Sequence, residues 1–226
     1  MSRPASATPE RDDGHGLSAG RAVAQAAVAG LVVGAVAQLC SQGGKAAREL
    51  GASTAFWVTI GFVLAWLTAR AWTGRDRAAW ACVVAAGYLF AWLLAYHALF
   101  AVLDHVPGSA VWGEAQRFVA AVAPACLILG LVAAASLRDG VVGDICLALP
   151  LGWSLPEAVL AARDGWTSAL VVGVPTLLSG LVPLLLTRDR RRRVSTVVIA
   201  ALATGLVVYL LSSTVLGMLN GYGPAT

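Results

Sequence analysis

Seven long apolar stretches, separated by short polar links, dominate the chain. They cover residues 22–40, 52–69, 78–103, 118–137, 141–161, 166–186 and 194–219. Each is long enough for a helix that crosses about 30 Å of hydrocarbon, which takes roughly 20 residues. The stretches are continuous and lack the two-residue alternation of membrane barrel strands. The pattern predicts an all-α fold, a polytopic transmembrane helical bundle of about seven spans.

Few residues lie outside these stretches. Residues 1–20 are polar and without apolar periodicity, and we expect them to form a disordered cytoplasmic tail. Residues 21–220 form the predicted bundle, and residues 221–226 a short C-terminal tail. Only 12% of the chain is charged, against about 25% in soluble domains. So few charges cannot cover a water-exposed surface, and lipid is therefore the expected solvent.

The basic residues predict the orientation of the bundle. With a cytoplasmic N-terminus and seven spans, 12 of the 16 Lys and Arg residues fall in inner segments. This excess is typical of the cytoplasmic side of a membrane protein, and it places the C-terminus outside. The 15 Arg and one Lys, with abundant Ala and Gly, are typical of a high-GC bacterial genome. The expected location is the bacterial cytoplasmic (inner) membrane.

Two features bear on the number of spans. If the fifth stretch did not cross, the arginine-rich loop 188–193 would lie outside, so the charge bias favours a crossing. The triplet 35–37, Ala-Val-Ala, is a candidate signal-peptidase site. The long polar region before it, which contains acidic residues, argues against cleavage. Cleavage would leave six spans in the same orientation.

Only two of the twelve acidic residues, Asp144 and Glu157, lie inside predicted spans. Acids at the centre of a span cost about 2.5–3.5 kcal/mol on insertion and are candidate functional groups. Each lies six residues from a charged loop, which is about 9 Å along a helix, so both can instead reach the headgroup zone. Glu157 has Trp153 one turn before it on the same face. Pro150 and Pro156 predict a kink or break there, as in helices that line binding cavities.

The third stretch ends with a second set of candidate residues. His97 and Asp104 lie seven residues apart on one stripe, about 10 Å apart along the axis. One hypothesis for them is a proton-handling or metal role, which no HExxH-like ligand spacing supports. The alternative is an interfacial cap with His97 bonded to a neighbouring helix. The candidate ligand-binding residues are therefore Glu157, Trp153, His97, Asp104 and Asp144, and no catalytic residue is assigned.

Other residues are expected to serve packing. Gly30 and Gly34 form a small-residue face in the first span, as do Ala201 and Gly205 in the last. Five tryptophans near predicted span ends fit an interfacial belt: Trp57, Trp72, Trp80, Trp112 and Trp166. Four cysteines are interpreted as apolar packing residues: Cys40, Cys82, Cys126 and Cys146. No ligand spacing or phosphate loop predicts a metal, a cofactor or a nucleic-acid partner.

The segment 50–57, LGASTAFW, leads into the second stretch. Its LGxSxxxW pattern resembles a family of small uncharacterised actinobacterial multi-pass membrane proteins. The resemblance implies a multi-pass membrane protein and transfers no activity or site residue. The size and all-helical plan are also similar to the substrate-binding membrane subunits of vitamin-uptake transporters, at the level of the fold alone.

Three functions are compatible with these features. The first is a component that binds or transports a small solute, in a cavity lined by Glu157 and Trp153. The second is an accessory or scaffold protein whose small-residue faces dock a membrane-protein partner or a second copy. The third is a membrane-embedded enzyme on a lipidic substrate, which requires His97, Asp104 and Glu157 to converge. An enzyme is the less favoured reading, and the lipid bilayer is the partner common to all three.

Overall fold

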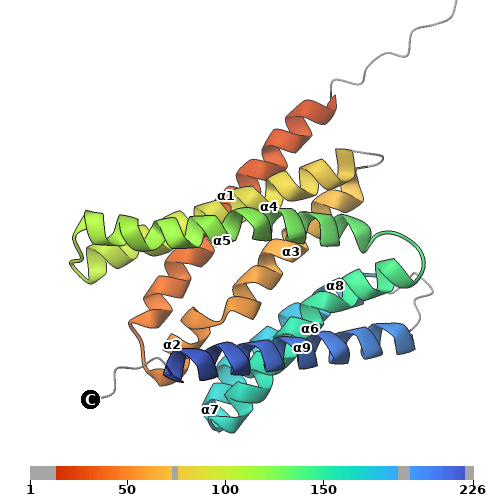
Figure 1. Cartoon of the computed structure of the whole chain (residues 1–226). Coiled ribbons are helices and arrows are strands. Elements are labelled where there is room, and N and C mark those ends of the chain that lie inside the picture. Colours follow the sequence, from red (N-terminus) through yellow and green to blue (C-terminus); the bar gives the residue numbers. More distant parts are fainter. Residues whose placement is uncertain (1–13, 73–75, 188–193, 222–226) are drawn as a thin grey trace, which may run out of the picture.

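Every regular element in the described part of the chain is a helix (Figure 1). The computed structural model describes residues 14–72, 76–187 and 194–221. The fold is therefore the predicted all-α helical bundle, and its long apolar helices make the chain a membrane protein. In chain order the elements are α1 (Gly14–Ser41), α2 (Lys45–Ala52), α3 (Thr54–Ala71), α4 (Asp76–Leu103), α5 (Gly108–Ala135), α6 (Val141–Arg163), α7 (Trp166–Ser168), η1 (Ala169–Gly173), α8 (Val174–Leu186) and α9 (Val194–Gly221).

Six segments of the described residues are long and apolar enough to cross a membrane. They are Ala19–Ser41, Thr54–Ala71, Asp76–Leu103, Phe118–Ala135, Val141–Arg163 and Trp166–Leu186. These correspond to the first six predicted stretches. The apolar part of α9 described in full, Val194–Leu210, is shorter than a span, so the seventh crossing stays a prediction.

The bundle differs from the sequence prediction at its N-terminal end. Residues 14–20, expected in a disordered tail, are the first turns of α1. Extending an existing helix needs no new nucleus, which explains why polar residues continue it. Residues 1–13 of the predicted tail and the C-terminal tail beyond Gly221 lie outside the described residues. The triplet 35–37 lies inside α1, where Ala37 is buried.

Close helix contacts depend on glycine at the α1–α4 interface. A Cβ atom on Gly30 would overlap the carbonyl oxygen of Tyr88, and one on Gly34 would overlap that of Trp92. Gly30 and Gly34 are four residues apart in α1, and Tyr88 and Trp92 are four residues apart in α4. The two contacts follow in the same order along both helices, so α1 and α4 run parallel. The small-residue face predicted from the sequence is therefore used inside the chain, against α4, and not on its surface.

The largest buried cluster lies among α1, α3, α4 and α5. Phe62 and Trp66 of α3 and Tyr88 of α4 are fully buried in it. A smaller cluster of Ala148, Val197 and Ala201 joins α6 to α9. Because α3 packs against α4 on one side and against α6 and α8 on the other, it links the two groups of helices.

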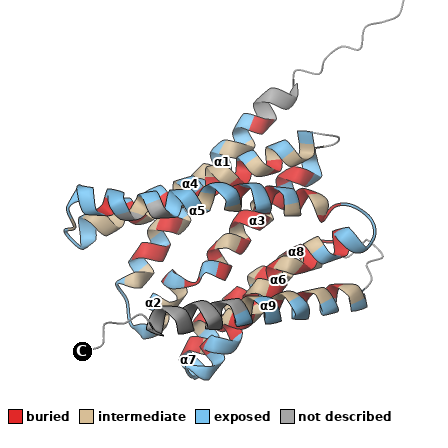
Figure 2. Ribbon diagram, viewed as in Figure 1, coloured by how far each residue is buried: buried red, intermediate tan, exposed pale blue. Residues whose placement is uncertain are grey.

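Figure 2 shows exposed residues along the outer faces of the helices, and many of the exposed residues carry large apolar side chains. Leu94 of α4 and Ile199 of α9 are each 66% exposed. A water-soluble protein rarely leaves contiguous apolar surface of this extent uncovered. The outer faces are therefore lipid-facing surfaces.

The proline-containing fifth stretch folds as one continuous helix, α6, and is not broken at Pro150 or Pro156. The Ser154 hydroxyl donates to the Pro150 carbonyl at 2.7 Å. The carbonyl of Gly152, which Pro156 leaves without its amide donor, faces α9 at Gly205. The irregular turn lies instead in the next span, where the π-helical segment η1 precedes Pro175. A π turn accommodates a proline that cannot donate to the preceding turn.

The α1–α4 contact predicts opposite outcomes for two glycines of one helix. Gly34→Ala should destabilise the fold by about 1–3 kcal/mol, because the added Cβ meets the backbone of α4. Gly20→Ala should be neutral or stabilising, because a Cβ there has no atom within 4 Å and alanine favours helix. Unfolding of the purified variants in mixed micelles measures both. Equal effects of the two substitutions would contradict this packing.

Candidate functional site

The corner between α2 and α3 is built by the segment 50–57. Ser53 precedes α3 as its N-cap, and its hydroxyl accepts from the Phe56 amide at 3.2 Å. The Trp57 indole N–H donates to the Gly51 carbonyl at 3.0 Å. Gly51 lets α2 approach α1, because a Cβ there would lie 2.6 Å from the Ala37 carbonyl oxygen. Gly51, Ser53 and Trp57 thus each hold this corner.

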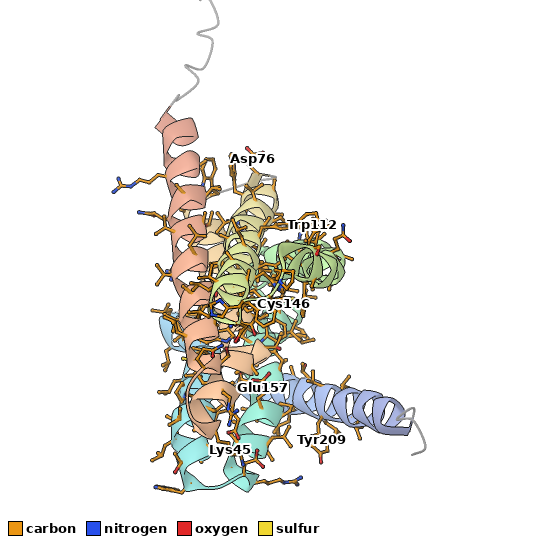
Figure 3. The ribbon with its side chains drawn as sticks, turned by 90° about the vertical axis from the view of Figure 1, so that its left-hand side faces the viewer. Lys45, Asp76, Trp112, Cys146, Glu157 and Tyr209 are labelled. Atoms are coloured by element: carbon orange, nitrogen blue, oxygen red, sulfur yellow. The ribbon has the colours of Figure 1, made fainter. Side chains whose placement is uncertain are left out.

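Glu157 of α6 caps α3 from outside that helix. One carboxylate oxygen accepts the Ala55 amide at 2.9 Å, and the other accepts the Ser53 hydroxyl in a short contact. The first amides of a helix have no partner within the helix. A carboxylate at this end also lies at the positive end of the helix dipole. Figure 3 shows Glu157 inside the bundle, close to the ribbon of the corner.

Two more polar contacts fasten α3 to its neighbours. Trp153, one turn before Glu157, donates its indole N–H to the Thr59 hydroxyl of α3 at 3.0 Å. Thr176 of α8 is fully buried with its hydroxyl 3.4 Å from that of Ser53. Trp153 and Glu157 therefore share a face, as predicted, and that face is directed at α3.

Comparison with models of protein families, with curated proteins and with solved structures finds no match to this chain. The assignment of site and function therefore rests on the residues and their geometry.

A cavity of about 430 Å³ lies on the other side of the same corner. Its aromatic wall comes from Trp57, Trp92, Tyr96, His97 and Phe118. Smaller residues of α2, α3 and α5 complete it, among them the exposed residues Ala52, Thr54 and Ala121. These exposed positions mark an opening between the corner and α5. Pockets for small molecules are commonly about 300–1,000 Å³ and mostly apolar.

Trp92, which lines this cavity, carries a hydrogen-bond donor without a partner. Its indole nitrogen is buried and has no hydrogen-bond partner within the described residues. The ring stacks on Tyr96, with centroids 5.6 Å apart. A buried donor without a partner costs about 1–3 kcal/mol.

His97 is buried in the wall between two hollows. Its ring contacts Tyr96 and Phe118, with centroids 5.5 and 5.4 Å away. His97 and Leu93 line both the 430 Å³ cavity and a second hollow of about 330 Å³ on the other side of α4 and α5. His97 therefore belongs to a cavity wall, and Phe118 of α5 is one of its neighbours there.

The other two candidate acids have separate surroundings. Asp104 accepts hydrogen bonds from Gln38 at 3.3 Å and from Gln42 at 3.2 Å, which join the ends of α4 and α1. Asp144 is buried in the first turn of α6, the end of a helix at which the dipole favours a negative charge.

The structure gathers only part of the predicted site. Glu157 and Trp153 meet α3, whereas Asp104 meets α1, so the two carboxylates lie on different contacts. Neither Glu157 nor Trp153 lines any of the cavities described above, and His97 alone of the candidates lines the largest aromatic one. Among the described residues, no group of three His, Cys, Asp or Glu side chains is placed to hold a metal ion.

Sequence reasoning missed the residues that complete the site. A serine directly before an apolar helical run is a recognised cap signal, so Ser53 was accessible from the sequence. Trp57 was expected in an interfacial belt but is only 5% exposed, because its indole N–H reaches back to Gly51. No sequence signal pairs Thr59 with Trp153 or marks Trp92 and Phe118 as cavity walls.

The cap contact predicts coupled losses of stability. Glu157→Ala should destabilise the fold by about 2 kcal/mol, the range for hydrogen bonds to a charged group. Ser53→Ala should cost about 1 kcal/mol. The double variant should lose less than both together, because the first substitution already removes the shared contact. Unfolding in mixed micelles measures these losses.

A matched acid on the same helix provides the control. Asp164 is exposed at the C-cap of α6, and Asp164→Ala should leave stability nearly unchanged. Fully additive losses for Ser53 and Glu157 would show that the two groups do not act together.

Proposed function

We propose that this membrane protein binds a small, mostly apolar solute in the cavity between the α2–α3 corner and α4–α5. The observation that carries the proposal is an aromatic cavity of about 430 Å³ with Trp92 in its wall, a residue whose indole nitrogen has no hydrogen-bond partner within the described residues. The solute would be a flat or compact molecule with a hydrogen-bond acceptor. Aromatic walls would supply contact area, and the acceptor would fix its orientation at Trp92.

The positions of the polar groups and the small residues favour a solute-binding protein over a scaffold protein or an enzyme. Gly30 and Gly34, which motivated a scaffold role, pack against α4 within the chain. The two acids that an enzyme would need to bring together form separate contacts between helices, Glu157 with α3 and Asp104 with α1. Glu157 instead supports the cavity indirectly, because it holds the corner whose other side forms the wall.

The orientation follows from charge alone. We propose that the protein lies in a bacterial cytoplasmic membrane with seven spans, its N-terminus inside and its C-terminus outside. The excess of basic residues on the predicted inner side supports this. The cavity would then lie toward the outer end of the bundle, because α3 begins there. Resemblance to the uncharacterised actinobacterial family remains part of this proposal.

Filling the cavity should weaken binding without unfolding the protein. The probe is a naphthyl ketone, which is apolar, aromatic and carries an acceptor, and its binding is followed by energy transfer from tryptophan in micelles. Wild-type protein should show saturable transfer. Ala121→Phe should weaken it about tenfold or more, because residue 121 is an exposed part of the cavity wall.

Two matched variants complete the experiment. Ala123→Phe adds the same ring to an exposed position of α5 outside the cavity and should bind as wild type does. Trp92→Phe keeps the aromatic wall but removes the donor, and should weaken binding of the ketone more than binding of naphthalene. Absence of saturable energy transfer, or an equal loss of binding in Ala121→Phe and Ala123→Phe, would contradict the proposal.

A further inference from the structure

α6 and α9 form an apolar groove that the cavity proposal does not use. The helices meet where Gly205 of α9 faces Gly152 of α6, with a Cβ on Gly205 placed 3.0 Å from the Gly152 carbonyl oxygen. Beyond this point a groove of about 320 Å³ runs between the two helices. Its apolar walls are Leu155, Pro156 and Val159 of α6 and Leu202 and Leu206 of α9. Figure 3 shows α9 leaving the bundle at an angle, with Tyr209 on it.

One end of the groove carries a cation. Arg163, the last residue of α6, lines the groove with Tyr209. Its guanidinium is 3.4 Å from the Tyr209 hydroxyl. Within the described residues, no carboxylate lies within ion-pair distance of Arg163. An exposed arginine at the end of a membrane helix therefore retains donors for an anion, and its planar fork suits phosphate.

The dimensions of the groove match one leaflet of a bilayer. From Leu155 to Arg163 the helix rises about 12 Å, and one leaflet contributes about half of a 30 Å hydrocarbon core. Trp166, three residues after Arg163, is 78% exposed, as expected of a tryptophan at the membrane interface. Arg163 thus lies at headgroup level, and the apolar walls extend from it toward the membrane centre.

We propose that the α6–α9 groove is a phospholipid-binding site. One acyl chain lies along the walls from Leu206 to Leu155, and the lipid phosphate accepts hydrogen bonds from Arg163 beside the Tyr209 hydroxyl. The cation at the end of an apolar groove of leaflet depth identifies a lipid as the occupant, since neither a free anion nor a purely apolar helix would use both features. This inference is independent of the solute cavity.

Native mass spectrometry of the full chain in detergent tests the site. The probe is a phosphatidylglycerol, compared with a diacylglycerol of the same acyl chains and with inorganic phosphate. Wild-type protein should retain phosphatidylglycerol at least about tenfold better than the diacylglycerol. Millimolar inorganic phosphate should not displace the lipid, because phosphate lacks the acyl chain.

Variants separate the headgroup from the groove. Arg163→Gln should lower retention of phosphatidylglycerol about tenfold, and Arg163→Lys should restore part of it. Arg48→Gln, which removes a basic residue of α2 away from the groove, should leave retention unchanged. Val159→Trp, at an exposed wall position, should lower retention of both lipids.

Three results would overturn the proposal. The first is equal retention by wild type and Arg163→Gln when circular dichroism shows both to be folded. The second is equal retention of diacylglycerol and phosphatidylglycerol by wild type. The third is an equal loss in Arg48→Gln, which would indicate general attraction of anionic lipid to basic residues.

Discussion

The interior of a bilayer offers no water, so a polar group placed there is stabilised by a partner within the protein. This constraint accounts for the contacts around α3. The first amides of that helix meet Ser53 and Glu157, and the Trp57 carbonyl accepts from the Tyr88 hydroxyl at 2.9 Å. Because Glu157 belongs to α6 and Tyr88 to α4, the hydrogen bonds made by α3 position a neighbouring helix on each side of it.

The α2–α3 corner consequently has two different faces. One face is polar and closed by Glu157 and Thr176, and the other is aromatic and bounds the cavity beside Trp92. The close α1–α4 contact at Gly34 fixes the backbone of Trp92 itself. The cavity is thus held by a cap and a glycine contact, neither of which needs to touch a bound solute. Apolar side chains on the outside leave the remaining faces to lipid.

The sequence predicts the helices well because their apolar runs are long and uninterrupted. α4 ends at Leu103 and α6 begins at Val141, as expected. Glu157 is recognisable because acids are rare inside spans. Its partner is not, because Ser53 lies 104 residues away and only the packing of α6 on α3 brings them together. The same limit applies to the cavity, which depends on space that side chains of four elements leave unfilled.

Local rules also mislead where neighbouring helices compensate. Pro150 and Pro156 predict a kink or a break, and the helix is not broken: α6 is continuous, with Ser154 and the close approach of Gly205 at the positions concerned. The π turn follows in η1, before Pro175, where the sequence pattern predicts no irregular turn.

Hydrogen–deuterium exchange in the first turn of α3 tests most directly whether Glu157 of α6 caps that helix. The amides of Ala55 and Phe56 should be protected in the wild-type protein, although neither has a partner within its own helix. Replacing Glu157 by alanine should accelerate exchange of the segment 53–58 by about tenfold or more, which corresponds to about 1.4 kcal/mol, and leave α5 unchanged. Unaltered exchange in that segment would contradict the account.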